Sequence, residues 1–219
     1  MISDRFSLSI SLEVDSLLIT APDKIFTKKL TDPQALEREL AAYRLDLPML
    51  PRLVEFIPPD TICVQKIDGI SYLDCWDAEI PAHLAETIAG FHLATYDGIN
   101  ALCHWDNQPR NILVSGAQVF LVDFADSRYA PPEADLTHLF LFWAAQMEFQ
   151  PFINAVNRFL QVYTAMLPLQ TQLWQESLAQ SRSRFDLRRA TYRKHLQPVS
   201  GDTGINRSYL DHIQFSHSG

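Results

Sequence analysis

Apolar residues in the first third of the chain recur at spacings that predict short strands and a single helix. The helix is expected to begin at Asp32-Pro33, because proline suits the first helical turn, and Leu36, Leu40 and Tyr43 form its apolar face. Apolar runs bounded by turn residues predict strands on either side of this helix. The strands are expected at residues 7–12, 17–20, 24–30, 52–56 and 61–67.

From residue 70 the pattern becomes helical, with one exception. Apolar residues spaced three and four apart predict helices, and the run after Asp135 is apolar on every side, which indicates a buried helix. The exception is a hairpin of two strands, 111–114 and 118–122, around Ser115-Gly116. Few apolar residues follow Pro198, so a loose tail is expected there. The helices are expected at residues 82–95, 135–145, 152–167 and 173–194.

This order of elements predicts an α+β fold with two lobes. Residues 1–67 are expected to form a small antiparallel-sheet lobe with one helix. Residues 68–197 are expected to form a larger, mostly helical lobe that carries the hairpin, and residues 198–219 form the tail. With 219 residues, 47% of them hydrophobic, the chain can bury a sizeable core. The hairpin is expected near the junction of the lobes, where small-molecule sites often form.

The net charge of −8 argues against nucleic acid as the main partner, because nucleic-acid-binding proteins usually carry a basic surface. One basic cluster near the end of the last predicted helix is the exception. It is interpreted either as a solvated helix face or as a docking surface for an anionic substrate or a partner protein. Its members are Arg182, Arg184, Arg188, Arg189, Arg193 and Lys194.

The cysteines and the start of the chain favour a cytoplasmic protein. An odd number of cysteines without a C-x-x-C spacing does not indicate a disulfide framework. The first residues lack the charged start and continuous apolar core of a signal peptide. The longest apolar run, residues 139–145, is far shorter than a bilayer requires, so no membrane span is expected.

The polar residues with the most informative spacing lie within residues 103–127. His104, Asp106 and Asn111 form an H-x-D-x-x-x-x-N run, and Asp123 follows the second hairpin strand. Phosphoryl transfer needs a carboxylate that accepts the proton of the acceptor hydroxyl, and an amide and a carboxylate that hold magnesium. Asp106, Asn111 and Asp123 are the candidates for these three tasks.

These residues resemble motifs of the protein-kinase-like phosphotransferases, most closely the aminoglycoside phosphotransferase and choline kinase branch. Residues 104–111 are similar to the H-G-D-x-x-x-x-N of that branch. Residues 121–124, Leu-Val-Asp-Phe, are similar to its I-D-F or I-D-W metal motif. Residues 132–136, Pro-Glu-Ala-Asp-Leu, are similar to its P-x-x-D-L motif, whose aspartate anchors the catalytic loop. The motifs cover residues 103–145, and the order of elements is similar over residues 7–165.

The resemblance implies a bilobal protein-kinase-like fold that uses ATP and magnesium to phosphorylate a hydroxyl group of a small molecule. Asp106 would orient this hydroxyl and accept its proton, while Asn111 and Asp123 would hold magnesium. His104 and Asp135 would support the loop. His104 would do so by hydrogen bonds, and Asp135 by capping the apolar helix or by accepting loop N–H groups.

The resemblance also asks for a lysine on the third strand that reaches the nucleotide phosphates and pairs with a glutamate on the next helix. Lys28 is favoured over its neighbour Lys29, because the residues before Lys28 fit an apolar-x-x-Lys pattern. Glu39 is favoured over Glu37, because Glu39-Leu-Ala-Ala-Tyr resembles the glutamate element of the family. Both alternatives remain open at this point.

The connector between the lobes would bind the adenine through its backbone, with Gln65 and Ile67 as the contact residues. The phosphate cover above the site departs from the family pattern, because no glycine precedes Gly69 and a glycine-rich loop is therefore absent. The turn expected in that place, residues 13–16, carries two acids, which would repel phosphates.

Two residues of the H-x-D run also depart from the family pattern. Gln108 stands where related kinases carry a lysine or a histidine, so Arg110 is the candidate for the positive charge beside the transferred phosphoryl group. Trp105 replaces a small residue between the histidine and the aspartate, which could narrow the site.

Three functions are compatible with these residues. The first is a kinase of a small molecule's hydroxyl group, favoured because the interval between Asp123 and Asp135 is too short for a regulated activation segment. The second is a minimal atypical protein serine/threonine kinase, for which the basic cluster would be a docking surface. The third is a pseudokinase or binding module, favoured by the missing glycines and by Gln108.

Overall fold

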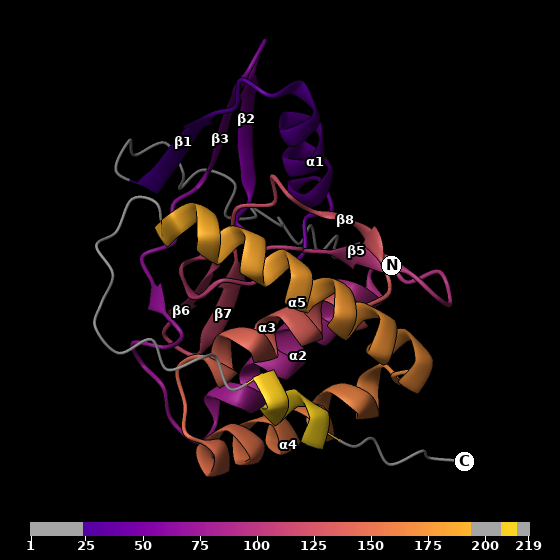
Figure 1. Ribbon diagram of the computed structural model, residues 1–219. Helices are drawn as coiled ribbons and strands as arrows, with labels where there is room; N and C mark the ends of the chain where they lie inside the picture. The colour runs from indigo at the N-terminus through magenta and orange to yellow at the C-terminus, as the bar shows by residue number, and fades with distance from the viewer. Residues whose placement is uncertain (1–23, 194–206, 214–219) are drawn as a thin grey trace, which may run out of the picture.

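The computed structural model describes residues 24–193 and 207–213 as a small lobe next to a larger, helical lobe (Figure 1). The strands expected at 7–12 and 17–20, and the acidic turn between them, lie outside the described residues. The remaining expected strands and helices occur in the predicted order. The α+β fold with two lobes that the sequence predicts is therefore confirmed.

The small lobe is an antiparallel sheet, in strand order β1-β3-β2, with one helix against it (Figure 1). Its elements are β1 (Ile25–Lys29), α1 (Pro33–Tyr43), β2 (Leu53–Ile57) and β3 (Thr61–Gln65). The side chain of Asp32 caps α1 by accepting a hydrogen bond from the backbone N–H of Gln34 at 3.0 Å. The buried face of α1 includes Leu36 and Leu40, as the apolar spacing predicts, and also Glu39.

The larger lobe consists of helices with short strands at its junction with the small lobe. Its helices are α2 (Ile80–Leu93), α3 (Glu133–Ala144), α4 (Phe149–Met166) and α5 (Thr171–Arg193). Its strands are β4 (Ile70–Ser71), β5 (Ala101–Cys103), β6 (Ile112–Ser115), β7 (Gln118–Leu121) and β8 (Arg128–Ala130), with a 3₁₀ turn, η2 (Pro109–Asn111), before β6. Within the described part of the chain, no helix is both long and apolar enough to cross a membrane.

The pairing of these strands brings two loops together. Strand β6 pairs with β7 in the predicted hairpin, and β5 pairs with β8. Residues 104–111 connect β5 to β6, and residues 122–127 connect β7 to β8. The strands that flank one loop are therefore paired with the strands that flank the other. This pairing holds the two loops side by side. The sequence did not predict β4, β5 and β8, because two or three residues are too few for a recognisable alternation.

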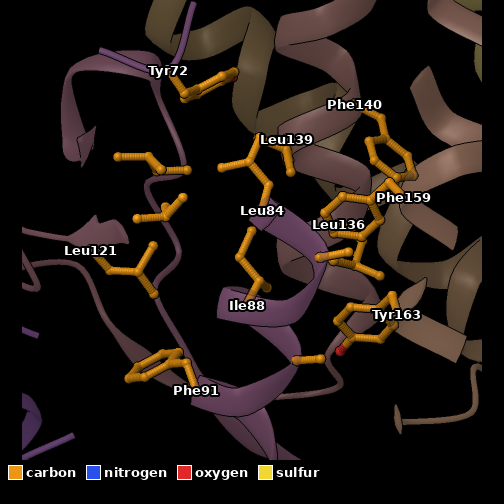
Figure 2. Close-up of a cluster of buried hydrophobic side chains, with 14 of the residues drawn as sticks. Tyr72, Leu84, Ile88, Phe91, Leu121, Leu136, Leu139, Phe140, Phe159 and Tyr163 are labelled. Carbon is orange, nitrogen blue, oxygen red and sulfur yellow. The ribbon is translucent and has the colours of Figure 1, made fainter. Parts of the chain in front are cut away.

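One hydrophobic core supports this arrangement. Figure 2 shows Leu84 and Ile88 of α2 between Leu121 of β7 on one side and residues of α3 and α4 on the other. The same cluster of buried residues extends to Leu36 of α1 and Ile62 of β3 in the small lobe. The hairpin is therefore packed against α2. Both lobes share one apolar interior.

The tail differs in part from the expected loose segment. Residues Arg207–His212 form a 3₁₀ helix, η3, that packs against α3 and α4. Leu210 is only 1% exposed, and Asp211 accepts a hydrogen bond from Arg182 of α5 at 2.6 Å. This stretch differs from the expected loose tail, because Tyr209 also packs on Phe149 and Phe152 of α4 in addition to these two contacts.

Candidate active site

A buried carboxylate holds the loop of residues 104–111. Asp135, in the first turn of α3, accepts hydrogen bonds from the backbone N–H groups of His104 (2.6 Å to Oδ2) and Trp105 (2.8 Å to Oδ1). Asn107 donates its side-chain amide to the backbone oxygen of Asp135 at 3.0 Å. Asp135 is 1% exposed, so these bonds form away from competing water.

His92 of α2 supports the same carboxylate. Its Nε2 donates to Oδ2 of Asp135 at 3.1 Å, since a carboxylate only accepts, and its Nδ1 lies 2.7 Å from the hydroxyl oxygen of Tyr163. Burial alone raises the pKa of Asp135, but His92 and the loop hold that pKa below its ordinary value, so the group is ionised at neutral pH. Sequence reasoning missed His92, because a histidine on an apolar helix face predicts only packing.

Cys103 lies beside this network. Ligand atoms of His92, Cys103 and Asp135 lie within 4.8 Å of one another. Burial raises the pKa of the Cys103 thiol well above its ordinary value, and the thiol donates to the backbone oxygens of Ala130 and Pro131 at 3.4 and 3.5 Å. The thiol therefore takes part in the hydrogen bonding around this network.

His104 links the two loops. Its Nδ1 accepts a hydrogen bond from the backbone N–H of Asp106 at 3.3 Å. Its Nε2 lies 2.8 Å from the backbone oxygen of Val122 and therefore carries the proton, which defines one neutral tautomer. With both ring nitrogens engaged, His104 connects the loop that carries Asp106 to the loop that carries Asp123.

Two neutral amides orient the carboxylate of Asp106. Gln108 donates its side-chain amide to Oδ2 at 2.7 Å, and Asn111 donates to the same oxygen at 3.1 Å and to the backbone oxygen of Asp106 at 3.0 Å. Asp106 is 8% exposed. Arg110 follows it in the sequence, on η2, and is exposed. Gln108 thus has a defined contact that sequence reasoning did not predict, because only its missing charge was considered.

Asp123 follows β7 and faces the small lobe. Its backbone is in the left-handed region (φ 68°), and its Oδ1 accepts a hydrogen bond from Lys28 Nζ at 2.7 Å. Burial raises the pKa of Asp123, but Lys28 outweighs this effect, so the pKa lies below its ordinary value. The Asp123 side chain is 42% exposed, which leaves the ionised carboxylate accessible to a cation.

Asn111 offers a further oxygen atom as a possible ligand. Because its amide nitrogen is directed at Asp106, its oxygen Oδ1 is on the opposite side of the amide and is the end that can accept. An ionised carboxylate and an amide oxygen are ligands that Mg²⁺ prefers. The donor set of Asp123 and Asn111 therefore fits magnesium.

Lys28 of β1 is the cation that connects the two lobes. Besides Asp123, its Nζ binds both carboxylate oxygens of Glu39 on α1, at 3.1 and 3.0 Å. Burial lowers the pKa of Lys28, but the two carboxylates raise it above its ordinary value. Lys29 points instead to Asp60 (3.2 Å), and Glu37 is exposed. The structure thus pairs the favoured member of each sequence alternative, Lys28 with Glu39.

Helix α1 is docked on the loop that carries Asp123. Arg38 donates its Nε proton to the backbone oxygen of Ala125 at 2.6 Å, and the backbone N–H of Asp123 donates to the hydroxyl oxygen of Tyr43 at 3.3 Å. Burial raises the pKa of Glu39, and Lys28 only partly offsets this effect. The small lobe therefore reaches the larger lobe through polar contacts from the middle and the C-terminal end of one helix.

The connector and β1 offer groups for a nucleobase. Gln65 and Lys66 use their backbone N–H groups in bonds to Arg52 and Lys24, at 2.8 Å each. No hydrogen bond joins the Ile67 N–H to another described residue. Phe26 is 53% exposed and lies two residues before Lys28, so both side chains are on the same face of β1. Sequence reasoning missed Phe26, because an apolar strand residue normally predicts core.

Trp105 adopts an unusual conformation directly before Asp106. Its φ of 69° is in the left-handed region, which costs a non-glycine residue about 1–2 kcal/mol. Two guanidinium groups lie over its ring, with Arg184 of α5 at 4.1 Å and Arg128 of β8 at 4.5 Å from the ring centroid. Each such contact contributes roughly 0.5–2 kcal/mol, so the stack is of the right size to offset the backbone strain.

The basic cluster predicted near the end of α5 is partly used within the chain. Arg184 stacks on Trp105, and Arg182 forms an ion pair with Asp211 at 2.6 Å. Arg188, Arg189 and Arg193 belong to the helix, but their side chains lie outside the described part of the structure. Their role as a partner surface stays a prediction.

Known structures share this two-lobe arrangement. An aminoglycoside phosphotransferase from Alicyclobacillus acidocaldarius has a TM-score of 0.61 at 15% identity, over 85% of this chain and 80% of that one. The choline kinase LicA from Streptococcus pneumoniae has a TM-score of 0.53 at 15% identity, over 87% and 85%. An aminoglycoside phosphotransferase from Streptomyces rimosus, in complex with ADP and streptomycin, has a TM-score of 0.54 at 14% identity, over 71% and 85%. At these identities the matches define the fold, which is protein-kinase-like.

The sequence itself identifies the family. Residues 22–169 match the model of the phosphotransferase enzyme family, and this range includes every residue of the loops described above. The chain therefore belongs to the phosphotransferase enzyme family. No curated protein matches the sequence. The resemblance to aminoglycoside phosphotransferases and choline kinases that the motifs indicated is confirmed.

Proposed function

We propose that this protein is an ATP- and magnesium-dependent kinase that phosphorylates a hydroxyl group of a small molecule. Membership of the phosphotransferase enzyme family supports the general activity. The observation that carries the proposal is the Glu39–Lys28–Asp123 chain of ion pairs between the lobes. It aligns a lysine for phosphate groups with a carboxylate for a metal, as phosphoryl transfer requires.

In this proposal each side chain has one task. Asp106, oriented by Gln108 and Asn111, accepts the proton of the attacking hydroxyl group. Lys28 binds the nucleotide phosphates while Glu39 keeps its ammonium group in place. Asp123 and Asn111 hold magnesium, which when bound neutralises phosphate charge.

The remaining positions of the predicted site complete the proposal. The Ile67 backbone binds the edge of the adenine, with Gln65 beside it, and Phe26 contacts the face of the base. Arg110 supplies positive charge near the transferred phosphoryl group, in place of the residue that Gln108 replaces. Because Arg110 is exposed, it is free of the desolvation cost that a buried cation would carry.

A thermal-shift experiment with purified protein tests nucleotide use. ATP with Mg²⁺ should raise the melting temperature, while ATP without Mg²⁺ should raise it much less, because stabilisation follows the affinity for the native state. Asp123→Asn should remove this dependence on Mg²⁺. An unchanged melting temperature of the wild type with MgATP would refute the proposal.

A screen of acceptors then identifies the substrate class. The wild type is supplied with MgATP and with sugars, aminoglycosides, choline-like alcohols or a protein mixture, and ADP production is compared with that of Asp106→Asn. Turnover with one small-molecule group supports the proposal. Phosphate incorporated only into protein would favour the atypical protein kinase instead.

A further inference from the structure

The Trp105 stack offers an inference that goes beyond the assignment of the reacting groups. Its three members come from three different parts of the chain: the loop of residues 104–111, β8 and α5. Arg128 pairs with Cys103 across strands β8 and β5. Its side chain lies over Trp105, which is two residues after Cys103. The stack therefore attaches α5 directly to the residue that precedes Asp106.

Helix α5 is a firm support for this contact. Figure 1 shows α5 running along α3, and the two helices share a hydrogen bond between the hydroxyl groups of Thr137 and Ser181 at 2.8 Å. Phe185, next to Arg184, is 5% exposed and packs on Phe142 with ring centroids 5.0 Å apart. Arg184 is consequently held by the same helix, α3, that supplies Asp135.

The loop of residues 104–111 is thus held both through its backbone and through a side chain. Asp135 binds the backbone N–H groups of His104 and Trp105, while Arg184 and Arg128 fix the ring of Trp105. Without the stack, a tryptophan at φ 69° would gain by leaving the left-handed region. That change would rotate the peptide that leads into Asp106, and a small displacement of a catalytic group is enough to slow a reaction strongly.

We propose that the Arg128–Trp105–Arg184 stack is a positioning device that makes phosphoryl transfer at Asp106 depend on the placement of α5. Trp105 and Arg184 are positioning residues in this scheme and touch neither ATP nor the acceptor. This inference rests on the proposed kinase function.

The test compares the steady-state hydrolysis of MgATP, with water as the acceptor, in single variants of the full chain. Arg184→Gln and Trp105→Ala should lower kcat about tenfold, while KM for MgATP changes less than about twofold, because the loop and not the nucleotide site is disturbed. Arg184→Lys and Trp105→Phe should recover part of the loss, since each keeps a cation or a ring. Arg182→Gln is the matched control, because Arg182 lies on the same helix but pairs with Asp211, and it should behave like the wild type.

A wild-type kcat in both Arg184→Gln and Trp105→Ala would overturn the inference. Hydrogen–deuterium exchange of the peptide covering residues 104–111 provides a readout that does not need turnover. Exchange should be at least about threefold faster in Arg184→Gln than in Arg182→Gln if the stack holds the loop. If the wild type does not hydrolyse MgATP, the thermal-shift experiment and the acceptor screen still decide on the proposed function, and the exchange measurement alone decides on the stack. Equal exchange in the two variants would overturn it.

Discussion

The two halves of the candidate site are built in different ways. The lower half, residues 104–111, is attached to the larger lobe by hydrogen bonds to the buried Asp135 and by the Trp105 stack. The upper half, Lys28 and Glu39 of the small lobe, is attached to Asp123 by the charged contact of Lys28, whose side chain is 22% exposed. Buried bonds lose little to water, whereas exposed charges exchange partners easily. In the proposed function, the base below would therefore be prearranged and the phosphate site above would be adjustable.

The direct bond between Lys28 and Asp123 makes the upper half adjustable. In the proposed function both groups have other partners during the reaction, Lys28 a phosphate group and Asp123 a magnesium ion. Their bond at 2.7 Å keeps each charge compensated until those partners arrive. In the same proposed function Glu39 would stay bound to Lys28, so the ammonium group would need to move only a short way.

The largest expected effect is on the lower half. Asp135→Asn presents an N–H₂ group or a weaker acceptor to donors that are all buried, and it should lower the free energy of unfolding by about 3–5 kcal/mol. The measurement is urea denaturation at pH 7. Asp211→Asn, a change of the same type at an exposed ion pair, should cost far less.

Asp135 also predicts the pH dependence of this loss. Its pKa is lowered by folding, so its contribution is present above the unfolded value of about 3.9 and disappears as the pH falls through the folded value. The stability difference between the wild type and Asp135→Asn should therefore shrink below pH 4. A constant difference from pH 7 to pH 3 would contradict the assigned role of the carboxylate.

The next effect separates orientation from chemistry. Asp106→Asn retains the size of the side chain but removes the base, and kcat for ATP turnover should fall about 10²–10³-fold with an unchanged melting temperature. Gln108→Ala should have a smaller effect, because it leaves the carboxylate and removes only one of its two amide donors. Equal losses in the two variants would mean that orientation alone accounts for the rate.

A smaller effect is expected in the upper half. Lys28→Met removes the cation that binds phosphate groups, and KM for MgATP should rise about tenfold to a hundredfold, as for loss of one charged hydrogen bond. Lys29→Met is the control, because its ammonium group pairs with Asp60 at the surface. If both variants raised KM equally, the assignment of Lys28, and not Lys29, as the phosphate-binding lysine would be wrong.

The smallest effect concerns the helix that carries Glu39. Asp32→Ala removes the N-cap of α1 and should lower the free energy of unfolding by about 1 kcal/mol. KM for MgATP should increase only slightly, since Glu39 lies in the middle of the helix and away from its frayed end. Chemical denaturation and steady-state kinetics measure the two quantities on the same sample.

The sequence predicted the parts of the site that are encoded locally. His104, Asp106, Asn111 and Asp123 belong to one short run whose spacing reflects the two loops beside the hairpin. The choice of Lys28 over Lys29 also followed from neighbouring residues, and the pairing with Glu39 agrees with it. These assignments concern positions, and their catalytic roles stay predictions that the experiments above address.

The rest of the site depends on contacts between distant parts of the chain. Arg184 lies far from Trp105 in sequence, and His92 is separated from Asp135 by most of the larger lobe's strands. Neither pair produces a sequence motif within one segment, so neither contact could be predicted from the sequence. The tail was misjudged for the same reason, because Leu210 is buried by α3 and α4 and not by its own neighbours.

The core shared by the two lobes has a consequence for how the chain unfolds. The backbone N–H of Leu121 in β7 donates to the oxygen of Met49, just before β2, at 2.9 Å, and Leu36 and Leu84 belong to one buried cluster. Neither lobe closes its interior without the other, so melting should be a single cooperative transition with equal calorimetric and van't Hoff enthalpies. Cutting the chain near Gly69 would then yield two fragments that fold only when they are mixed.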